Sequence, residues 1–164
     1  MQTLDEIDRK YDLIINCTGL GAQALTGDNV FPIRGQVLSV RKPADLSPAI
    51  IYANDAESTT YIIPRSRDCL LGGTYQYRDG NMEVDPTITA GILARCAVFN
   101  AALAQPEILQ QRVGLRPGRY FPRLDQTRLS SGQTVIHNYG HGSVGHTLAW
   151  GCAAEVAKLA TIIT

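Results

Sequence analysis

The sequence has no excess of either charge, because fifteen basic side chains balance fifteen acidic ones at neutral pH. It also has no basic cluster, so we expect no nucleic-acid partner. No apolar run approaches the roughly 20 residues that span a bilayer, which argues against a membrane protein. The first residues, MQTLDEIDRKYD, are acidic and amphipathic, unlike a secretory signal. The apolar content of 45% and the charged content of 18% are those of a globular protein with a real core.

Cysteines are few and scattered. The four of them form no C-x-x-C pair, which favours reduced, partly buried thiols in an intracellular protein. The last residues, TIIT, carry no peroxisomal tripeptide. We therefore expect a cytoplasmic location, with the peroxisome open for a eukaryotic source.

The pattern of apolar residues divides the chain into different kinds of structure. A β-branched run at 11–19 predicts a buried, parallel strand. Four further runs between 35 and 77, separated by turn-forming residues, predict an antiparallel sheet. Asp85 and Pro86 then predict the start of a helix, which Pro106 closes. Its buried face would carry apolar side chains, namely Ile88, Ile92, Cys96, Phe99 and Leu103.

The last third contains a strand, a turn rich in proline and arginine, a second strand at 134–140 and a helix from 146. Both ends of the chain therefore have α/β character, and the middle is an antiparallel sheet with one helix. We predict an α/β fold into which an α+β region is inserted.

Two glycine clusters imitate dinucleotide-binding motifs. Gly140, Gly142 and Gly145 have the spacing G-x-G-x-x-G, but no second strand or ribose-binding acid follows. GLGAQA, from Gly19, follows a strand, yet the next helix is too short for a crossover. Either cluster could be only a tight turn. A helix start with close-approaching glycines could also hold an anion.

Three histidines (His137, His141 and His146) lie around the same turn. Glycines interrupt their spacing, so they share no helix face, and we expect no metal site there.

Six segments together resemble one family: YDLIINCTGLGA, FPIRGQVLSV, TYIIPR, LGGTY, RVGLRPGR and VIHNYGHGSVGHTLAWGCAAEVAKL. Their order and sequence are similar to the C-terminal part of the FAD-dependent D-amino-acid and D-aspartate oxidases. The resemblance covers nearly the whole chain, but the G-x-G-x-x-G strand that binds the FAD pyrophosphate in this family is not present.

The resemblance implies a domain organisation. Residues 1–36 would be part of an FAD-binding domain, 37–115 a substrate-binding domain of mostly antiparallel sheet plus one helix, and 116–164 a return to the FAD-binding domain. The missing N-terminal half would then be a partner, and a homodimer is a further assembly that we keep open.

The resemblance also assigns substrate-binding residues. Arg116, in GLRPGR, matches the arginine that holds the substrate carboxylate, for which a planar guanidinium fork is suited. By itself, an arginine in a turn is usually only solvated. Tyr61 matches a tyrosine on the same carboxylate, although a strand tyrosine can simply pack in a core. Tyr75 matches a second active-site tyrosine and favours neutral D-amino acids, while Arg78 nearby keeps D-aspartate open. Glu57 replaces a lid tyrosine of some members.

Cofactor contacts follow from the same resemblance. The turn and helix start at 140–147 would lie against the flavin ring, where helix N–H groups stabilise the negative charge of the reduced flavin. Gln36 would hydrogen-bond the ring. The expected FAD-binding residues are Thr18, Gly19, Arg34, Gly35, Gln36, Gly140, Gly142, Ser143, Val144, Gly145 and Thr147.

The implied reaction is oxidative deamination. The substrate Cα hydrogen passes as hydride to flavin N5, the imino acid hydrolyses to a 2-oxo acid and ammonia, and molecular oxygen yields hydrogen peroxide. Arg116, Tyr61 and Tyr75 would act by positioning the substrate. The alternatives are a D-aspartate or glycine oxidase, or a catalytically silent fragment or partner subunit. For the chain alone we expect weak or no FAD binding.

Overall fold

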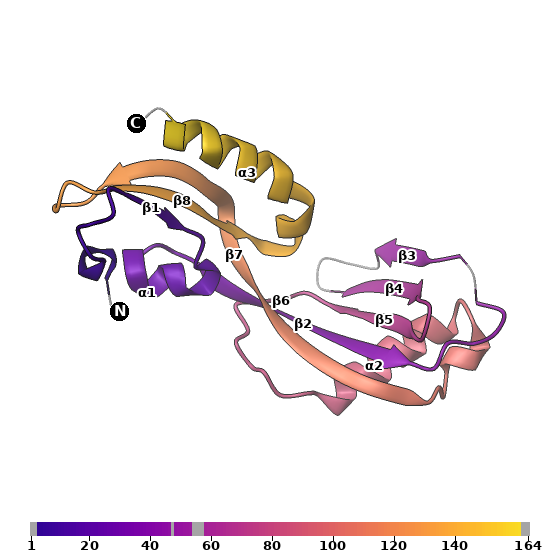
Figure 1. Cartoon of the computed structure of the whole chain (residues 1–164). Coiled ribbons are helices and arrows are strands. Elements are labelled where there is room, and N and C mark those ends of the chain that lie inside the picture. Colours follow the sequence, from indigo (N-terminus) through magenta and orange to yellow (C-terminus); the bar gives the residue numbers. More distant parts are fainter. Residues whose placement is uncertain (1–2, 47, 54–57, 162–164) are drawn as a thin grey trace. The chain divides into compact units, whose positions relative to one another are not determined.

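The computed structural model describes residues 3–46, 48–53 and 58–161 (Figure 1). The chain divides into two compact units. Unit 1 combines Met1–Pro32 with Arg116–Thr164, and unit 2 is Ile33–Leu115. The first boundary therefore falls four residues before the expected end of the first segment at 36, and the second falls between residues 115 and 116. Together the units contain a mixed sheet and helices, as an α/β protein should.

Unit 1 is built on a small mixed sheet. Strand β1 (Leu13–Asn16) pairs in parallel with β8 (Thr134–His141), and β8 pairs antiparallel with the second part of β7 (Ile108–Arg128). The helical elements of this unit are η1 (Leu4–Glu6), η2 (Gly19–Gly21), α1 (Ala22–Thr26), η4 (Gly142–Val144) and α3 (Gly145–Thr161). Helix α3 contacts β8 and follows directly from it (Figure 1).

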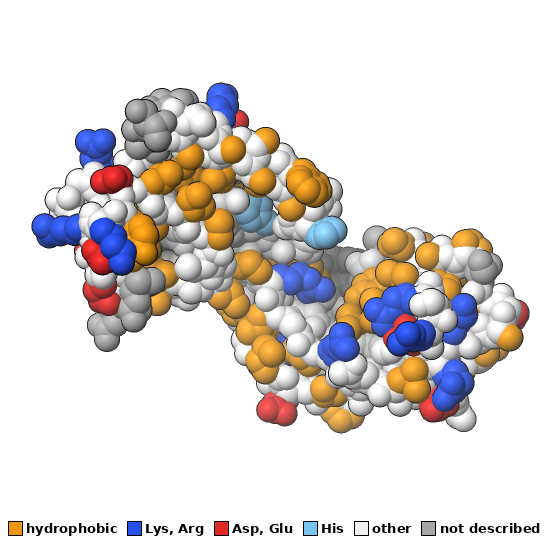
Figure 2. All heavy atoms as spheres, in the orientation of Figure 1, with side chains coloured by type: hydrophobic (Ala, Val, Ile, Leu, Met, Phe, Trp, Pro, Cys, Tyr) orange, Lys and Arg blue, Asp and Glu red, His pale blue; other side chains and the backbone are white. Residues whose placement is uncertain are grey.

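Strand β1 is less buried than its sequence predicts. Ile14 and Asn16 are buried, but Ile15 is 49% exposed. The physical reason is that β1 lies at the edge of the sheet formed by the described residues, where only β8 pairs with it. Other residues cover one face of β1, and Ile15 lies on the other face. Val144, Leu148 and Trp150 are also exposed, and Figure 2 shows apolar side chains along α3.

The stretch rich in proline and arginine is not the turn that the sequence predicts. It lies inside β7, a strand of 21 residues. The pairing with β8 jumps from Gly118 opposite His141 to Arg123 opposite Tyr139. The intervening β7 residues therefore form an irregularity in which Tyr120 and Phe121 are exposed. A bulge of this kind accommodates proline, which has no N–H for the ladder.

Unit 2 is an antiparallel sheet with one helix. Strands β2 (Phe31–Val40), β5 (Cys69–Thr74), β4 (Ser58–Pro64) and β3 (Ile50–Ala53) follow one another in that order, and β6 (Gln76–Tyr77) also pairs with β2. Helix α2 (Pro86–Ala97) and the short η3 (Ala101–Leu103) complete the unit. β2 begins at the end of unit 1, and β7 runs from unit 2 into unit 1.

Alternate side chains of this sheet form the core of unit 2. Leu38, Leu71 and Ile62 are fully buried and cluster with Ile92 and Cys96 of α2. Along β2 and β4 the next residues belong to the opposite face and are half-exposed, which is the alternation of a sheet covered on one side.

The start of α2 agrees with its sequence, whereas its end does not. The Asp85 side chain accepts hydrogen bonds from the backbone N–H groups of Thr87 (2.7 Å) and Ile88 (3.3 Å), as an N-cap should. The helix ends at Ala97. Phe99 therefore leaves the buried face on which we expected it, is 41% exposed and contacts Tyr52.

Within the described residues, no helix is both long and apolar enough to cross a membrane.

Candidate active site

The turn between β8 and α3 requires glycine for two different reasons. Gly140 and Gly142 have φ angles of 81° and 56°, a left-handed conformation that side chains disfavour. In addition, a Cβ atom at Gly140 would lie 2.7 Å from Cβ of Arg119. The backbone can therefore follow this path only with a bare glycine. As a result, strand β8 turns sharply into a helix start.

The start of α3 offers free space and hydrogen-bond donors together. Gly145 is its first residue, and Ser143, Val144 and Thr147 around it are exposed. The first N–H groups of a helix have no partner within the helix and lie at its positive end. An electron-rich ring edge with oxygen and nitrogen acceptors fits this donor set. These residues can hold such a group through backbone N–H groups and the Thr147 hydroxyl.

The NCTG turn after β1 lies in the same unit. The Asn16 side chain accepts hydrogen bonds from the Thr18 hydroxyl (2.7 Å) and the Thr18 backbone N–H (3.2 Å), which fixes the turn. Gly19 has a φ of 57°, and a Cβ atom there would lie 3.5 Å from Cγ of Pro117. The turn therefore approaches the residue that follows Arg116. Arg116 itself is half-buried on β7.

An ion cluster that the sequence did not reveal stabilises the neighbouring part of β7. Asp28 Oδ2 accepts a hydrogen bond from the Tyr139 hydroxyl (2.8 Å) and contacts Nε of Arg119 (3.1 Å). Arg123 Nη1 donates to the Tyr139 hydroxyl (2.8 Å) and lies 3.4 Å from the same carboxylate. Burial alone would raise the pKa of Asp28, but the hydrogen bonds from Tyr139 and Arg119 outweigh it, so the pKa is lowered. Arg119 and Arg123 thus support the fold.

His137 is held between two polar side chains inside unit 1. Because Asn16 Oδ1 accepts from Thr18, the Asn16 amide donates to His137 Nδ1 (3.2 Å). His137 Nε2 then carries the proton of the neutral ring and donates to the Thr127 hydroxyl (2.9 Å). Burial lowers the pKa of His137, and the positive charge of Arg123 adds to this effect.

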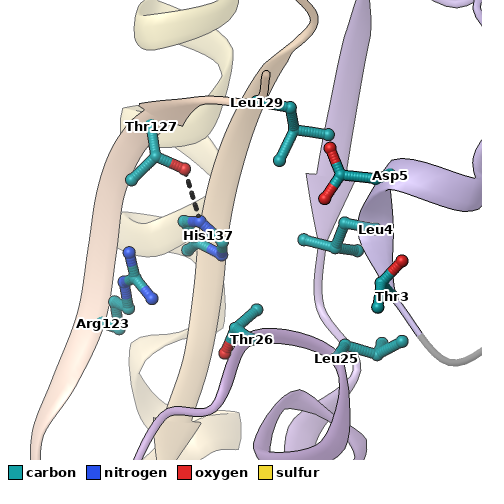
Figure 3. A pocket seen from close by; sticks show the side chains of 9 residues that line it. All are labelled: Thr3, Leu4, Asp5, Leu25, Thr26, Arg123, Thr127, Leu129 and His137. Atoms are coloured by element: carbon teal, nitrogen blue, oxygen red, sulfur yellow. Dashed lines mark hydrogen bonds between the residues drawn. The ribbon is translucent and has the colours of Figure 1, made fainter. Parts of the chain in front are cut away.

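The same histidine lines a cavity of about 320 Å³. Figure 3 shows this cavity between η1, α1 and the β7 and β8 strands. Its lining is a mixture of polar and apolar side chains: Thr3, Leu4, Asp5, Leu25, Thr26, Arg123, Thr127, Leu129 and His137. None of them is a predicted site residue. No local motif predicts this cavity, because its lining combines residues 3–26 with residues 123–137.

Two predicted substrate residues lie in unit 2. Tyr61 is half-buried on β4, on the sheet face that α2 does not cover, and Tyr75 is half-buried between β5 and β6. Arg78 is exposed, with its guanidinium 5.5 Å from the centre of the Tyr77 ring. The predicted third substrate residue, Arg116, belongs to unit 1. Glu57, the expected lid position, lies outside the described residues.

The predicted flavin residues Arg34, Gly35 and Gln36 also lie in unit 2, where all three are buried. Arg34 donates to the side chains of Gln36 (3.0 Å) and Gln76 (2.6 Å). Gln36 Oε1 also accepts from the Asp85 backbone N–H, and its Nε2 donates to the Asp85 carbonyl and the Thr89 hydroxyl, each at 2.9 Å. The side-chain amide of Gln36 is therefore hydrogen-bonded to Arg34 and to the start of α2.

The remaining candidates for chemistry are metal-ligating side chains and cysteine thiols. No group of three or more His, Cys, Asp or Glu side chains able to hold a metal occurs in the part of the chain that the structure describes. The four cysteines are free thiols. Burial raises the pKa of the Cys96 thiol to about 11, and Cys152 Sγ lies 3.4 Å from His141 Nε2.

The fold is similar to those of two oxidases of known structure. The chain superposes on a glycine oxidase from Geobacillus kaustophilus with a TM-score of 0.75 over 90% of its length, at 23% identity. An iminodiacetate oxidase from Chelativorans gives a TM-score of 0.67 over 84% of the chain, at 21% identity. At such low identity the likeness concerns the fold alone.

The sequence places the chain within a family. The model of the FAD dependent oxidoreductase (DAO) family matches residues 2–159, and the chain belongs to this family. It is 43% identical to a D-amino-acid oxidase from Rubrobacter xylanophilus over 98% of its own length and 49% of that protein. It is 39% identical to a human D-aspartate oxidase over 97% of its length and 47% of that protein. The chain thus spans about half the length of the curated relatives that it matches.

Proposed function

We propose that the chain serves in the FAD-dependent oxidation of D-amino acids, giving a 2-oxo acid, ammonia and hydrogen peroxide. The observation that carries this proposal is the 43% identity to a D-amino-acid oxidase across nearly the whole chain. The residues that the sequence assigned to substrate and cofactor are compatible with this role, because several of them are accessible side chains or helix N–H groups.

The substrate would be held by its carboxylate. Arg116 offers a planar fork with two parallel donors, and Tyr61 offers a hydroxyl for the same group. Tyr75 would contact the substrate from the loop after β5 and favour an uncharged side chain. None of these residues needs to exchange a proton with the substrate. Their contribution is to orient the Cα–H bond and to bind the charged end of the amino acid.

The cofactor would contact unit 1. The start of α3, with Ser143, Val144, Gly145 and Thr147, fits the electron-rich edge of a flavin, and the Thr18–Gly19 turn would lie nearer its ribose and phosphate end. When bound, the flavin supplies the electron-accepting chemistry that amino-acid side chains lack. Positive charge at a helix start favours the reduced, more negative form.

Arg34 and Gln36 have a different role in this proposal. Since their polar groups bond within unit 2, we infer that they shape the β2 segment and anchor α2. A flavin contact from this segment would then come from the Gly35 backbone.

This assignment makes unit 1 part of the FAD-binding domain and unit 2 the substrate-binding domain. The remainder of the FAD-binding domain, including its pyrophosphate loop, would be supplied by the half of the family fold that these residues do not cover. The exposed Ile15, Leu148 and Trp150 of unit 1 suit burial against such a half. A dimer of the complete assembly is compatible with the proposal.

A second candidate function is D-aspartate oxidation. Its support is the 39% identity to the human D-aspartate oxidase and the position of Arg78, three residues after Tyr75 and exposed, where it could meet a second carboxylate. The tyrosine at 75 favours the first function. A third candidate, a silent partner subunit, predicts no turnover in any assembly.

The test uses the chain combined with the missing half of the fold and loaded with FAD. Peroxide release is measured with D-alanine, D-aspartate and glycine, for the unaltered protein and for Arg116→Leu. We expect turnover of D-alanine, and its loss by at least about a hundredfold in the variant, with FAD still bound. Arg112→Leu is the matched control, because this exposed arginine bonds only to Gln110 among the contacts described.

The three candidates give different results. Preference for D-aspartate would select the second candidate, and no turnover of any substrate by a flavin-loaded assembly would select the silent subunit. Unchanged kinetics in Arg116→Leu would remove Arg116 from the substrate role. The 164 residues alone should bind FAD weakly or not at all. A preparation of these residues that contains a stoichiometric amount of FAD would contradict the assignment of the pyrophosphate loop to the other half.

A further inference from the structure

We propose that Gly72 and Gly73 form a seat for the ring of Tyr61 and thereby set the position of its hydroxyl. They would be positioning residues for substrate binding, which rests on the proposed function of Tyr61.

The seat begins with the strand register. Tyr61 of β4 lies directly opposite Gly72 of β5 in the antiparallel ladder. Directly opposed residues project to the same face of the sheet, with Cβ atoms about 5 Å apart. A side chain at 72 would therefore stand beside that of Tyr61. Because residue 72 is glycine, the ring of Tyr61 can pack against the backbone of β5.

The distances show that the ring occupies this space. A Cβ atom built on Gly72 would lie 2.1 Å from Cζ and 2.3 Å from the hydroxyl oxygen of Tyr61. A Cβ atom on Gly73 would lie 2.8 Å from the same hydroxyl. Real Cβ contacts are never this short, so even alanine at either position requires the phenol to move. The atoms that would collide are the rigid end of the ring, which has only two side-chain torsions with which to escape.

A left-handed φ angle does not explain these glycines. The described glycines with positive φ are Gly19, Gly27, Gly132, Gly140 and Gly142. Gly72 and Gly73 are not among them, so their φ angles are open to other residues. The requirement for a missing side chain comes from the space that Tyr61 fills.

Other contacts hold the strand beneath the ring. Arg95 of α2 donates a hydrogen bond from Nη2 to the Gly73 carbonyl (3.1 Å). On the opposite face, Leu71 and Ile62 are fully buried in the core against Ile92. The backbone of β5 under the ring is thus held by contacts with α2, and the ring lies on the sheet face that α2 does not cover. The hydroxyl end of Tyr61 consequently lies against the backbone of Gly72 and Gly73.

The experiment separates positioning from folding through a double-mutant cycle. Gly72→Ala is made in the unaltered chain and in Tyr61→Ala, and the urea midpoint of each of the four proteins is measured. Gly114→Ala is the control, because a Cβ atom at this position in β7 meets nothing within 4 Å. The second readout is D-alanine kinetics of the flavin-loaded assembly carrying Gly72→Ala or Tyr61→Phe.

The seat predicts strong coupling. Gly72→Ala should lower the midpoint in the unaltered chain and lower it less than half as much once the ring is absent, while Gly114→Ala should not lower it. In the assembly, Gly72→Ala should raise KM for D-alanine about tenfold with kcat changed far less, as should Tyr61→Phe. Tyr61→Phe should lower the midpoint less than Tyr61→Ala does, because it retains the ring.

Two results would overturn the proposal. One is an equal loss of midpoint from Gly72→Ala with and without the Tyr61 ring. The other is an unchanged KM in a Gly72→Ala assembly whose Tyr61→Phe counterpart has a raised KM. If the unaltered assembly turns over no amino acid, the proposed function fails, and the urea cycle still decides whether the seat exists.

Discussion

Replacement of Asp28 by asparagine tests the ion cluster that ties β7 and β8 to the segment before β2. Asp28 and its two arginines are mostly buried, with side chains 13%, 29% and 18% exposed for Asp28, Arg119 and Arg123. Asparagine has nearly the same shape but lacks the charge. It also presents an NH₂ group where Asp28 now accepts hydrogen bonds from Tyr139 and Arg119.

The magnitude follows from the contacts that are lost. The carboxylate accepts at 2.8 Å from the Tyr139 hydroxyl, at 3.1–3.2 Å from Arg119 Nε and at 2.8 Å from the Asn29 backbone N–H. An asparagine oxygen can keep one or two of these bonds but not the charge. Hydrogen bonds to a charged group contribute about 1.5–3 kcal/mol each. After allowance for the partial exposure of the arginines, we expect Asp28→Asn to lower the free energy of unfolding by about 2–3 kcal/mol.

The assay is urea unfolding followed by far-ultraviolet circular dichroism at several pH values. Since the folded pKa of Asp28 is lowered, its contribution is full above the ordinary carboxyl value of about 3.9 and is lost as pH falls through the folded pKa. The difference between the two proteins should therefore shrink under strong acid. Asp125→Asn is the control, because that side chain is 52% exposed and pairs with Arg123 alone. A loss below about 0.5 kcal/mol in Asp28→Asn would refute the reasoning, because that is the size of effect expected of an exposed pair.

Three further substitutions test other parts of the structure. His137 has a lowered pKa, so the chain should lose stability as pH falls below about 6.5, and His137→Gln should flatten this dependence when urea midpoints at pH 7.5 and 5.5 are compared. Asp85→Ala removes the N-cap of α2 and should cost about 1 kcal/mol in urea unfolding, whereas Asp45→Ala on an exposed site should cost little. Ile92→Ala leaves a cavity in the core of unit 2 and should cost about 2–5 kcal/mol, and a loss below 1 kcal/mol would show that the core closes around it.

Local sequence signals predicted much of the fold because they act over a few residues. The Asp85–Pro86 helix start, the alternating strands of unit 2 and the strand–turn–helix at residues 134–161 all depend on caps, periodicity and glycine torsions. The same signals misjudged residues 116–123. Proline and arginine there favour a turn, but the pairing of β7 with β8 continues on both sides of them and makes the segment a bulge. Local propensity was overridden by a long-range ladder.

The candidate site likewise contains residues that the sequence predicted and residues that it did not. The glycines of the β8–α3 turn were visible in the sequence because their spacing is local. The contacts of Asp28 with Arg119 and of Asn16 with His137 join residues 91 and 121 positions apart, so no short window of sequence contains them. Gln36 was predicted at the flavin from its motif alone, whereas the structure shows its amide bonded to Asp85 and Thr89. A motif indicates that a residue type is needed at a position, but not which of its neighbours the side chain contacts.

The function that we propose for this chain is participation in D-amino-acid oxidation through a bound flavin. The most direct measurement is the absorbance of the flavin in the complete assembly, without oxygen, after addition of D-alanine or L-alanine at equal concentration. The account predicts that D-alanine bleaches the oxidised flavin band and that L-alanine leaves it unchanged. Bleaching by both enantiomers, or by neither in an assembly that holds FAD, would contradict it.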